Sequence, residues 1–239
     1  MEHKNNIFIK SIVFGVIILF LGVAVQPGLA SVQTKEEINL EPKGYLFETI
    51  IDIANNPDIK NLIEQNKLND LVNDFDYNFR SVYNKILFKN PMLFGSLILT
   101  KPSISYEYLT KCYNDGIKIS DIIGYYKTQE IIDSLEDIDK DFLDDINTII
   151  NNNKELSNKI ETLKEMNSDY GSDSKGNNTI ICAILMLILI PTALSSAFYK
   201  ILRDIFGFIP SLFLIFTRKH FVRKLIAVSC VVLRISLGC

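Results

Sequence analysis

The feature that most constrains this chain is a run of 23 residues, 177–199, that contains no charged side chain. Its centre reads ICAILMLILI and ends just before Pro191. At 1.5 Å per residue, a helix of this length can cross a hydrocarbon layer of about 30 Å. A helix that is apolar on every face needs either a bilayer or a large protein core. Because we expect no such core in a chain of 239 residues, the sequence predicts a transmembrane helix over residues 179–200, kinked at Pro191.

The distribution of charge supports a membrane-tethered arrangement. The chain carries 25 basic and 28 acidic residues, a net charge of −3. Residues 31–178 hold 16 basic and 26 acidic residues, whereas residues 179–239 hold seven basic residues and one acidic residue. An acidic middle beside an apolar, basic end is typical of a domain held outside the cytoplasm by a membrane segment. The acidic middle also predicts no nucleic-acid partner, because phosphates need a basic surface.

Residues 1–30 have the three parts of a secretory signal: a weakly basic start, the uncharged run 11–25, and small residues before a cleavage point. Gly28 and Ala30 form the small pair, which predicts cleavage after Ala30. The apolar run is short for a spanning helix, and an uncleaved signal anchor is the alternative. Either outcome places residues 31–178 outside the cytoplasm.

Residues 43–168 show helical spacing, which predicts an all-α extracytoplasmic bundle of about six helices. Leu46, Ile50 and Ile53, for example, fall on one helical face. The polar residues 31–42 precede this domain as a linker, and we expect residues 169–178 to form a flexible juxtamembrane linker after it.

Residues that start and stop helices are recognisable within this domain. Pro57 and Pro91 suit the first turns of helices, and the asparagine before each disfavours continuation of the previous helix. Ser103 is a candidate N-cap for a helix, and Gly116 is a candidate left-handed residue at the end of that same helix.

The longest apolar pattern, residues 132–163, alternates with spacings of three and four, as in a coiled coil. As one helix it would form a stalk about 48 Å long that pairs with a second copy. However, Leu143 and Ile150 widen the apolar stripe, which favours a globular bundle. The asparagines at 151–153 are equally suited to a turn between two shorter helices. Self-association through residues 132–163 therefore stays open.

The acidic middle lacks the side chains that catalysis and metal binding use most often. Both histidines, His3 and His220, lie outside it, so it offers no imidazole for a triad, a general base or an ordinary zinc site. Its one thiol, Cys112, is expected to be a small core residue. No phosphate-binding glycine loop or nucleophile elbow is present. We predict no catalytic residue, no cofactor and no metal ligand.

One acidic cluster, residues 136–145 (EDIDKDFLDD), invites a calcium-binding interpretation. A calcium loop counted from Asp137 would need glycine where Phe142 stands and glutamate where Thr148 stands. An exposed acidic start of a helix, favoured by the helix dipole, accounts for the cluster instead.

Two further apolar segments follow the predicted transmembrane helix. Residues 205–217 are uncharged but short, and the basic residues on both sides favour a re-entrant or interfacial segment. Residues 225–239 allow a further membrane helix in which Arg234 reaches toward lipid headgroups. The number of crossings in residues 179–239 is therefore between one and three.

Three parts of the chain resemble a group of uncharacterised archaeal exported membrane proteins. They are the start KNNIFIKSIVFGVIILFLGVAVQPGLA, the Asn-, Ile- and Lys-rich helical middle with the segment KPSISYEYLTKCYNDGIKI, and the apolar tail. The resemblance implies no activity and no catalytic residue.

These features predict a membrane-anchored, extracytoplasmic helical protein that acts by interaction, as an envelope scaffold, surface adaptor or subunit of a membrane complex. The expected partners are the lipid bilayer and another membrane or envelope protein. A second hypothesis is an accessory of a membrane transport complex that acts through residues 179–239, with Arg234 as a charge within the membrane. A third is an exported hydrolase that uses paired carboxylates, although no motif selects a pair.

Overall fold

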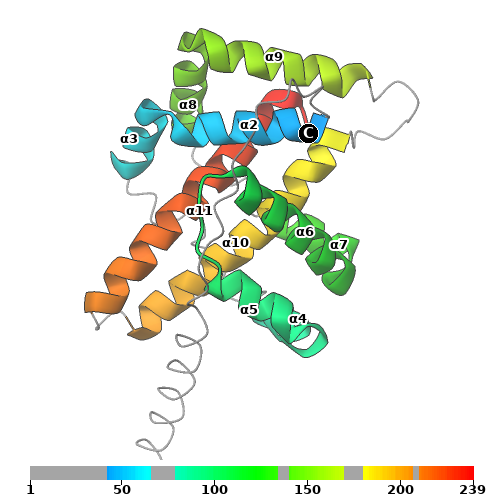
Figure 1. Ribbon diagram of the computed structural model, residues 1–239, viewed down its shortest axis with the longest axis vertical. Coiled ribbons are helices and arrows are strands. Elements are labelled where there is room, and N and C mark those ends of the chain that lie inside the picture. Colours follow the sequence, from blue (N-terminus) through cyan, green and yellow to red (C-terminus); the bar gives the residue numbers. More distant parts are fainter. Residues whose placement is uncertain (1–41, 66–78, 134–139, 170–179, 207–209) are drawn as a thin grey trace, which may run out of the picture. The chain divides into compact units, whose positions relative to one another are not determined.

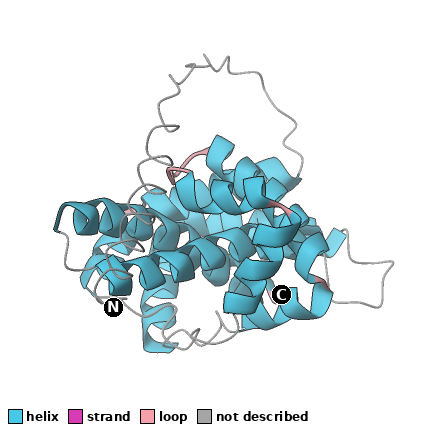
Figure 2. Ribbon diagram, turned by 90° about the horizontal axis from the view of Figure 1, so that it is seen from below, coloured by secondary structure: helices cyan, strands magenta, loops and turns pink. Residues whose placement is uncertain are grey.

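The computed structural model describes residues 42–65, 79–133, 140–169, 180–206 and 210–239. The chain divides into two compact units, Met1–Asn39 and Leu40–Cys239, and every described residue belongs to the second. All regular elements in these ranges are α-helices, which confirms the all-α prediction there (Figures 1 and 2). The predicted leader and both predicted linkers lie outside the described residues, apart from Pro42 and Asp169. The helices are α2 (Pro42–Asn55), α3 (Pro57–Gln65), α4 (Phe79–Lys89), α5 (Pro91–Leu99), α6 (Tyr106–Ile123), α7 (Tyr125–Asp133), α8 (Lys140–Asn152), α9 (Lys154–Asp169), α10 (Ile180–Phe206) and α11 (Pro210–Leu237).

The acidic middle contains more helices than predicted. Its described parts hold eight, α2 to α9, where the sequence predicted about six. Single residues separate several neighbouring helices, namely Asn56, Asn90, Gly124 and Asn153. Such one-residue breaks hardly disturb the apolar periodicity, so two short helices are easily interpreted as one longer helix.

The predicted helix starts at Pro57 and Pro91 are confirmed, since these residues begin α3 and α5. Asn90 is the N-cap of α5, and its side-chain oxygen accepts a hydrogen bond from the backbone N–H of Leu93 at 3.0 Å. This bond satisfies one of the donors that the first turn of a helix leaves without a partner.

Helix α6 is longer than predicted. Its N-cap is Ser105 rather than Ser103, and the Ser105 hydroxyl accepts from the N–H of Tyr108 at 3.3 Å. The helix continues through Gly116 and ends at Gly124, whose φ of 89° lies in the region that favours glycine. The prediction that Gly116 stops the helix was therefore wrong.

Residues 132–163 do not form one continuous helix. α8 and α9 are separated at Asn153, whose side-chain oxygen accepts from the N–H of Leu156 at 3.2 Å. The alternative of a turn between two shorter helices is confirmed here, and the continuous stalk is wrong. Leu143 and Ile150 are buried, as expected for a wide apolar stripe in a bundle.

Helices α10 and α11 run antiparallel and pack against each other along their length (Figure 1). The prediction of two separate segments, 205–217 and 225–239, was wrong, because α11 is one helix from Pro210 to Leu237. No glycine or proline interrupts it before Gly238, which has a φ of 70° at its end.

Helix α10 lies at the centre of the core and contacts α2, α5, α6, α7 and α11. Within the described residues, Ile180–Phe198 is the one stretch of helix long and apolar enough to cross a membrane, and 78% of its most hydrophobic window is buried. We expected a chain of this size to provide too little cover for such a helix. That expectation was wrong, because the helices around α10 turn their apolar faces toward it.

At Gly116 the backbones of α6 and α10 come very close to each other. A Cβ added to Gly116 would lie 1.8 Å from the carbonyl oxygen of Leu187. Leu187 stands four residues before Pro191, which has no N–H to donate to that carbonyl. The bare Cα of Gly116 therefore lies against a carbonyl that lacks the usual N–H donor four residues later in α10.

We predict that Gly116→Ala destabilises the fold by about 1–3 kcal/mol or more, because the added methyl group forces two backbones apart. Denaturant unfolding of the full chain, followed by circular dichroism, measures the effect. Gly95→Ala in α5 is the matched control, since nothing lies within 4 Å of its Cβ position. It should be neutral or stabilising by up to about 1 kcal/mol. Equal effects of the two substitutions would contradict the close crossing.

Candidate functional site

Buried polar groups meet where the C-terminus of α5 contacts α10 and α11. The backbone carbonyl of Leu97 accepts from the Ser195 hydroxyl at 3.0 Å and from Arg223 Nη2 at 3.5 Å. Arg223 Nη2 also donates to the carbonyl of Thr100 at 3.1 Å. The last carbonyls of a helix have no partner within it and carry partial negative charge. Arg223 and Ser195 therefore satisfy the end of α5 and connect three helices.

Beside this helix end, Ser96, Lys111 and Asp115 form a hydrogen-bonded group. The Ser96 hydroxyl donates to Asp115 Oδ2 at 3.1 Å, and Lys111 Nζ donates to both side chains. A serine next to a lysine can act as a nucleophile when the lysine accepts the serine proton. Here Lys111 is the donor and forms an ion pair with Asp115 of the same helix, α6. The hydrogen bonds of Ser96 to these two side chains tie α5 to α6.

A cavity of about 10 Å³ lies among these side chains and is also lined by Tyr108 and Cys112. This is roughly the space of one water molecule and far below the size of a substrate site. Burial raises the pKa of the Cys112 thiol to about 12, against the opposing effects of Tyr108 and Lys111. The thiol stays protonated at neutral pH, and the prediction that Cys112 is a small buried core residue is confirmed.

A larger hollow, of about 470 Å³, opens on the surface where α2 meets α3 and α8 meets α9. Two of its amides are helix caps: Asn56 accepts from the N–H of Ile59, and Asn153 from that of Leu156. The lining is mostly polar, unlike the apolar pockets that hold most small molecules. The hollow is lined by Asn56, Asp58, Ile149, Asn152, Asn153 and Lys154.

The acidic cluster forms part of the start of α8. Residues 136–139 lie outside the described part of the chain, while Asp141, Asp144 and Asp145 are exposed on the helix. Asp141 lies in the first turn, where the helix dipole favours an acid. Within the described ranges, no three His, Cys, Asp or Glu side chains are grouped so that they could hold a metal ion.

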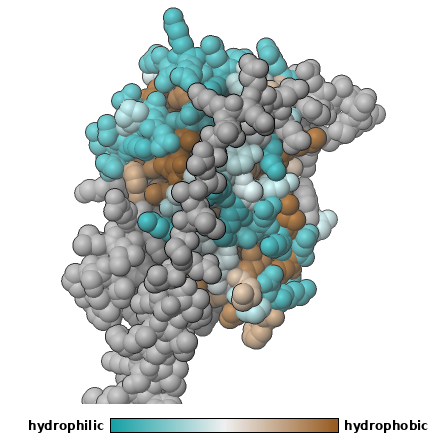
Figure 3. All heavy atoms as spheres, viewed as in Figure 1, coloured by the Kyte–Doolittle hydropathy of each residue, from teal (hydrophilic) through white to brown (hydrophobic). Residues whose placement is uncertain are grey.

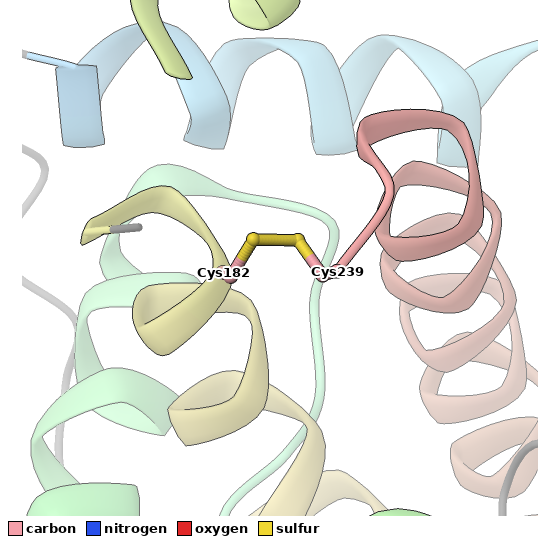
Figure 4. Close-up of a disulfide and its surroundings, with 2 residues drawn as sticks. All are labelled: Cys182 and Cys239. Atoms are coloured by element: carbon pink, nitrogen blue, oxygen red, sulfur yellow. A yellow bond between two sulfur atoms is a disulfide. The ribbon is translucent and has the colours of Figure 1, made fainter. Parts of the chain in front are cut away.

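Cys182 and Cys239 form a disulfide, shown in Figure 4. The bond joins the first turn of α10 to the second residue after α11, with Cα atoms 5.7 Å apart and a sequence separation of 57. It closes the helix pair at the end opposite the connection between the two helices. The sequence did not predict this bond, because residues 205–217 and 225–239 have the pattern of separate segments. Two antiparallel helices of 27 and 28 residues would have placed both cysteines at one end.

Arg234, which the sequence singled out, is buried in the last turn of α11. A positive charge is favoured there by the partial negative charge of the helix end. Of the two histidines, His220 belongs to α11 and His3 lies outside the described residues.

Comparison of the chain with protein-family models, with curated proteins and with solved structures finds no match. The resemblance to archaeal exported proteins therefore stays a prediction. The function has to be argued from charge, packing and covalent linkage.

We predict that Ser195→Ala destabilises the fold by about 1 kcal/mol, because the Leu97 carbonyl loses the shorter of its two hydrogen bonds. Denaturant unfolding measures this change. Ser229→Ala is the control, since that buried hydroxyl bonds only within α11, to the carbonyl of Leu225 at 2.7 Å. The control should change stability by less than about 0.5 kcal/mol. A larger loss in the control than in Ser195→Ala would refute the proposed role of Ser195.

Thiol counting tests the disulfide. The two free cysteines, Cys112 and Cys230, are buried, so the folded chain should react slowly with maleimide. The denatured chain should show two thiols before reduction and four after it. Replacing Cys182 by serine should lower stability by up to roughly 4 kcal/mol for a loop of 57 residues. Adding Cys239→Ser should lower it no further, and additive losses would argue against a bond between the two residues.

Proposed function

We propose that this chain is an exported, membrane-associated helical protein that acts by interaction, as a scaffold or adaptor of the cell envelope. The disulfide between Cys182 and Cys239 carries the proposal, because disulfides form and persist mainly in oxidising compartments outside the cytoplasm. The secretory-type leader at residues 1–30 supports the same location. Cys182 also lies only a few residues beyond the acidic middle, which suits a common location for both.

The disulfide limits the paths that the chain can take through a membrane. Cys182 and Cys239 have to be on the same side to bond, so the number of crossings between them is even. Residues 182–239 therefore cross either twice or not at all.

The covering of α10 favours the form without a crossing. Gly116 of α6 meets α10 at Leu187, near the middle of Ile180–Phe198. The outer face of α6 exposes Glu107, Lys118 and Asp121. If α10 spanned a bilayer with α6 in place, these charges would lie in or near hydrocarbon, at about 2.5–3.5 kcal/mol each for Asp or Lys. We propose that α10 is the core helix of a domain outside the cytoplasm. In this form the signal anchor, the alternative to cleavage after Ala30, is retained, and residues 11–25 provide the tether.

A second candidate is an accessory of a transport complex in which the α10–α11 pair crosses the bilayer twice. It is favoured by four basic residues that flank the connection between these helices in the sequence, as cytoplasmic loops require. This form needs α10 to leave the helices that cover it. The four residues are Lys200, Arg203, Arg218 and Lys219.

An exported carboxylate hydrolase gains little support. The surface hollow between α2–α3 and α8–α9 is lined by one carboxylate, Asp58. Glycoside hydrolysis of the common type needs two carboxyl groups facing one bond.

Protease accessibility in sealed cells separates these forms. We predict that a protease site inserted at residues 207–209 is cleaved from outside, as is a control site in the linker at 170–176. Protection of the first site with cleavage of the second would favour two crossings. Protection of both sites would overturn export. Recovery of the chain only in the soluble fraction would overturn membrane association.

A further inference from the structure

The α4–α5 hairpin is basic, whereas the domain that contains it is acidic. Residues 77–106 contain no aspartate or glutamate, although acidic residues outnumber basic ones by ten across residues 31–178. Lys85 and Lys89 are exposed, and Lys85 Nζ also donates to the carbonyl of Ile123 at 3.5 Å. The basic residues of this acid-free segment are Arg80, Lys85, Lys89 and Lys101.

The turn between α4 and α5 also exposes large apolar side chains. Phe88 and Met92 are 85% and 83% exposed, and Leu87 is 41% exposed. Single exposed apolar residues are common on soluble proteins, but three within six positions, beside exposed lysines, form a local apolar patch. In Figure 3, brown and tan atoms are visible toward the lower right of the described surface, the region of α4 and α5 in Figure 1.

Contacts fix this hairpin next to the C-terminal half of α10. The hydroxyl of Tyr83 in α4 donates to the Leu194 carbonyl at 2.6 Å. The ring of Phe94 in α5 meets that of Phe198 edge-on, with centroids 5.7 Å apart. Lys85 and Lys89 belong to this hairpin, so exposed basic residues lie in this part of the unit. α8 and α9, which carry seven acidic and four basic residues, lie at its other end (Figure 1).

We propose that the α4–α5 turn, residues 85–92, is a membrane-docking tip for an anionic lipid bilayer. Phe88 and Met92 enter the interfacial layer, while Lys89 extends along its surface to the headgroups. Lys85, next to the Ile123 carbonyl, adds positive charge beside the tip. The proposal rests on the membrane association proposed above and names the surface that makes it. Each basic residue held near an anionic surface favours binding about fivefold. A projecting turn suits a fluid headgroup layer better than a protein interface, which needs about 800 Å² on each partner.

The test uses the full-length chain reconstituted in phosphatidylcholine vesicles with or without one part in three phosphatidylglycerol. A fluorophore is attached at Met92→Cys, since the native free thiols are buried. We expect spin-labelled lipids to quench it at least twofold more in the anionic vesicles. Glu161→Cys on α9, an exposed position at the acidic end, is the control. There a water-soluble quencher should act and the lipid quencher should not.

Charge variants test the role of the lysines with the same fluorophore. Lys85→Glu with Lys89→Glu should lower the ratio of docked to free tip by at least about 25-fold, because each substitution removes a favourable charge and adds a repelled one. Lys154→Glu with Lys164→Glu on α9 changes the net charge equally and should leave the ratio unchanged. Circular dichroism confirms folding, and Phe88→Ser, at an exposed site, provides a variant that leaves the core intact and should also weaken docking.

The outcomes separate the two proposals. If the chain floats with vesicles but lipid quenchers do not reach the tip, the docking tip is wrong and membrane association stands. If the chain does not float, both fail. If the fluorophore becomes shielded from both quenchers as protein concentration rises, the tip binds protein instead, which also overturns the proposal.

Discussion

The fold depends on covering one uncharged helix with the rest of the chain. A helix as apolar as α10 stabilises a domain only if its neighbours remove it from water on all sides. This requires close approach, and Gly116 provides it by placing the α6 backbone against the Leu187 carbonyl. Pro191 is the reason that this carbonyl is available. The position of α6 then follows from two residues 75 positions apart in the sequence.

The same helix, α10, is compatible by composition with either a bilayer or a protein core. Length and composition would let Ile180–Phe198 span a bilayer, yet its most hydrophobic window is largely buried among protein helices. The two environments exclude each other, because the helices that cover α10 carry charges on their outer faces. The disulfide adds a covalent condition to this choice, since it holds the two ends of the α10–α11 pair on one side of any membrane.

Local patterns in the sequence predicted local structure well. The faces of Leu46, Ile50 and Ile53 are buried as their spacing indicated, and the prolines at 57 and 91 begin helices. The errors came from features that only tertiary structure decides. Gly116 is compatible with a helix stop or a close crossing, and only its neighbour in α10 distinguishes them. The basic residues near 218–224 favoured a break between membrane segments, but Arg223 lies inside a continuous helix and bonds to the end of α5.

In the candidate site, too, the sequence predicted local features but not the contacts between helices. The sequence correctly placed Cys112 in the core, since a lone thiol with no histidine in the acidic middle to act as a thiolate partner behaves as a small hydrophobic residue. It could not reveal that Ser195 and Arg223, on different helices, converge on the Leu97 carbonyl. Nor did it reveal the pairing of Cys182 with Cys239, because cysteine spacing alone leaves connectivity undetermined.

The burial of Cys112 and Cys230 has a consequence for oxidative folding. In an oxidising compartment, four cysteines on one chain offer wrong partners as well as right ones. Packing that surrounds α10 sequesters two of these sulfur atoms, while Cys182 and Cys239 meet at the helix ends. Collapse of the hydrophobic core around Cys112 and Cys230 would therefore leave Cys182 and Cys239 as the pair free to react. The same packing that stabilises the core would thus select the correct disulfide.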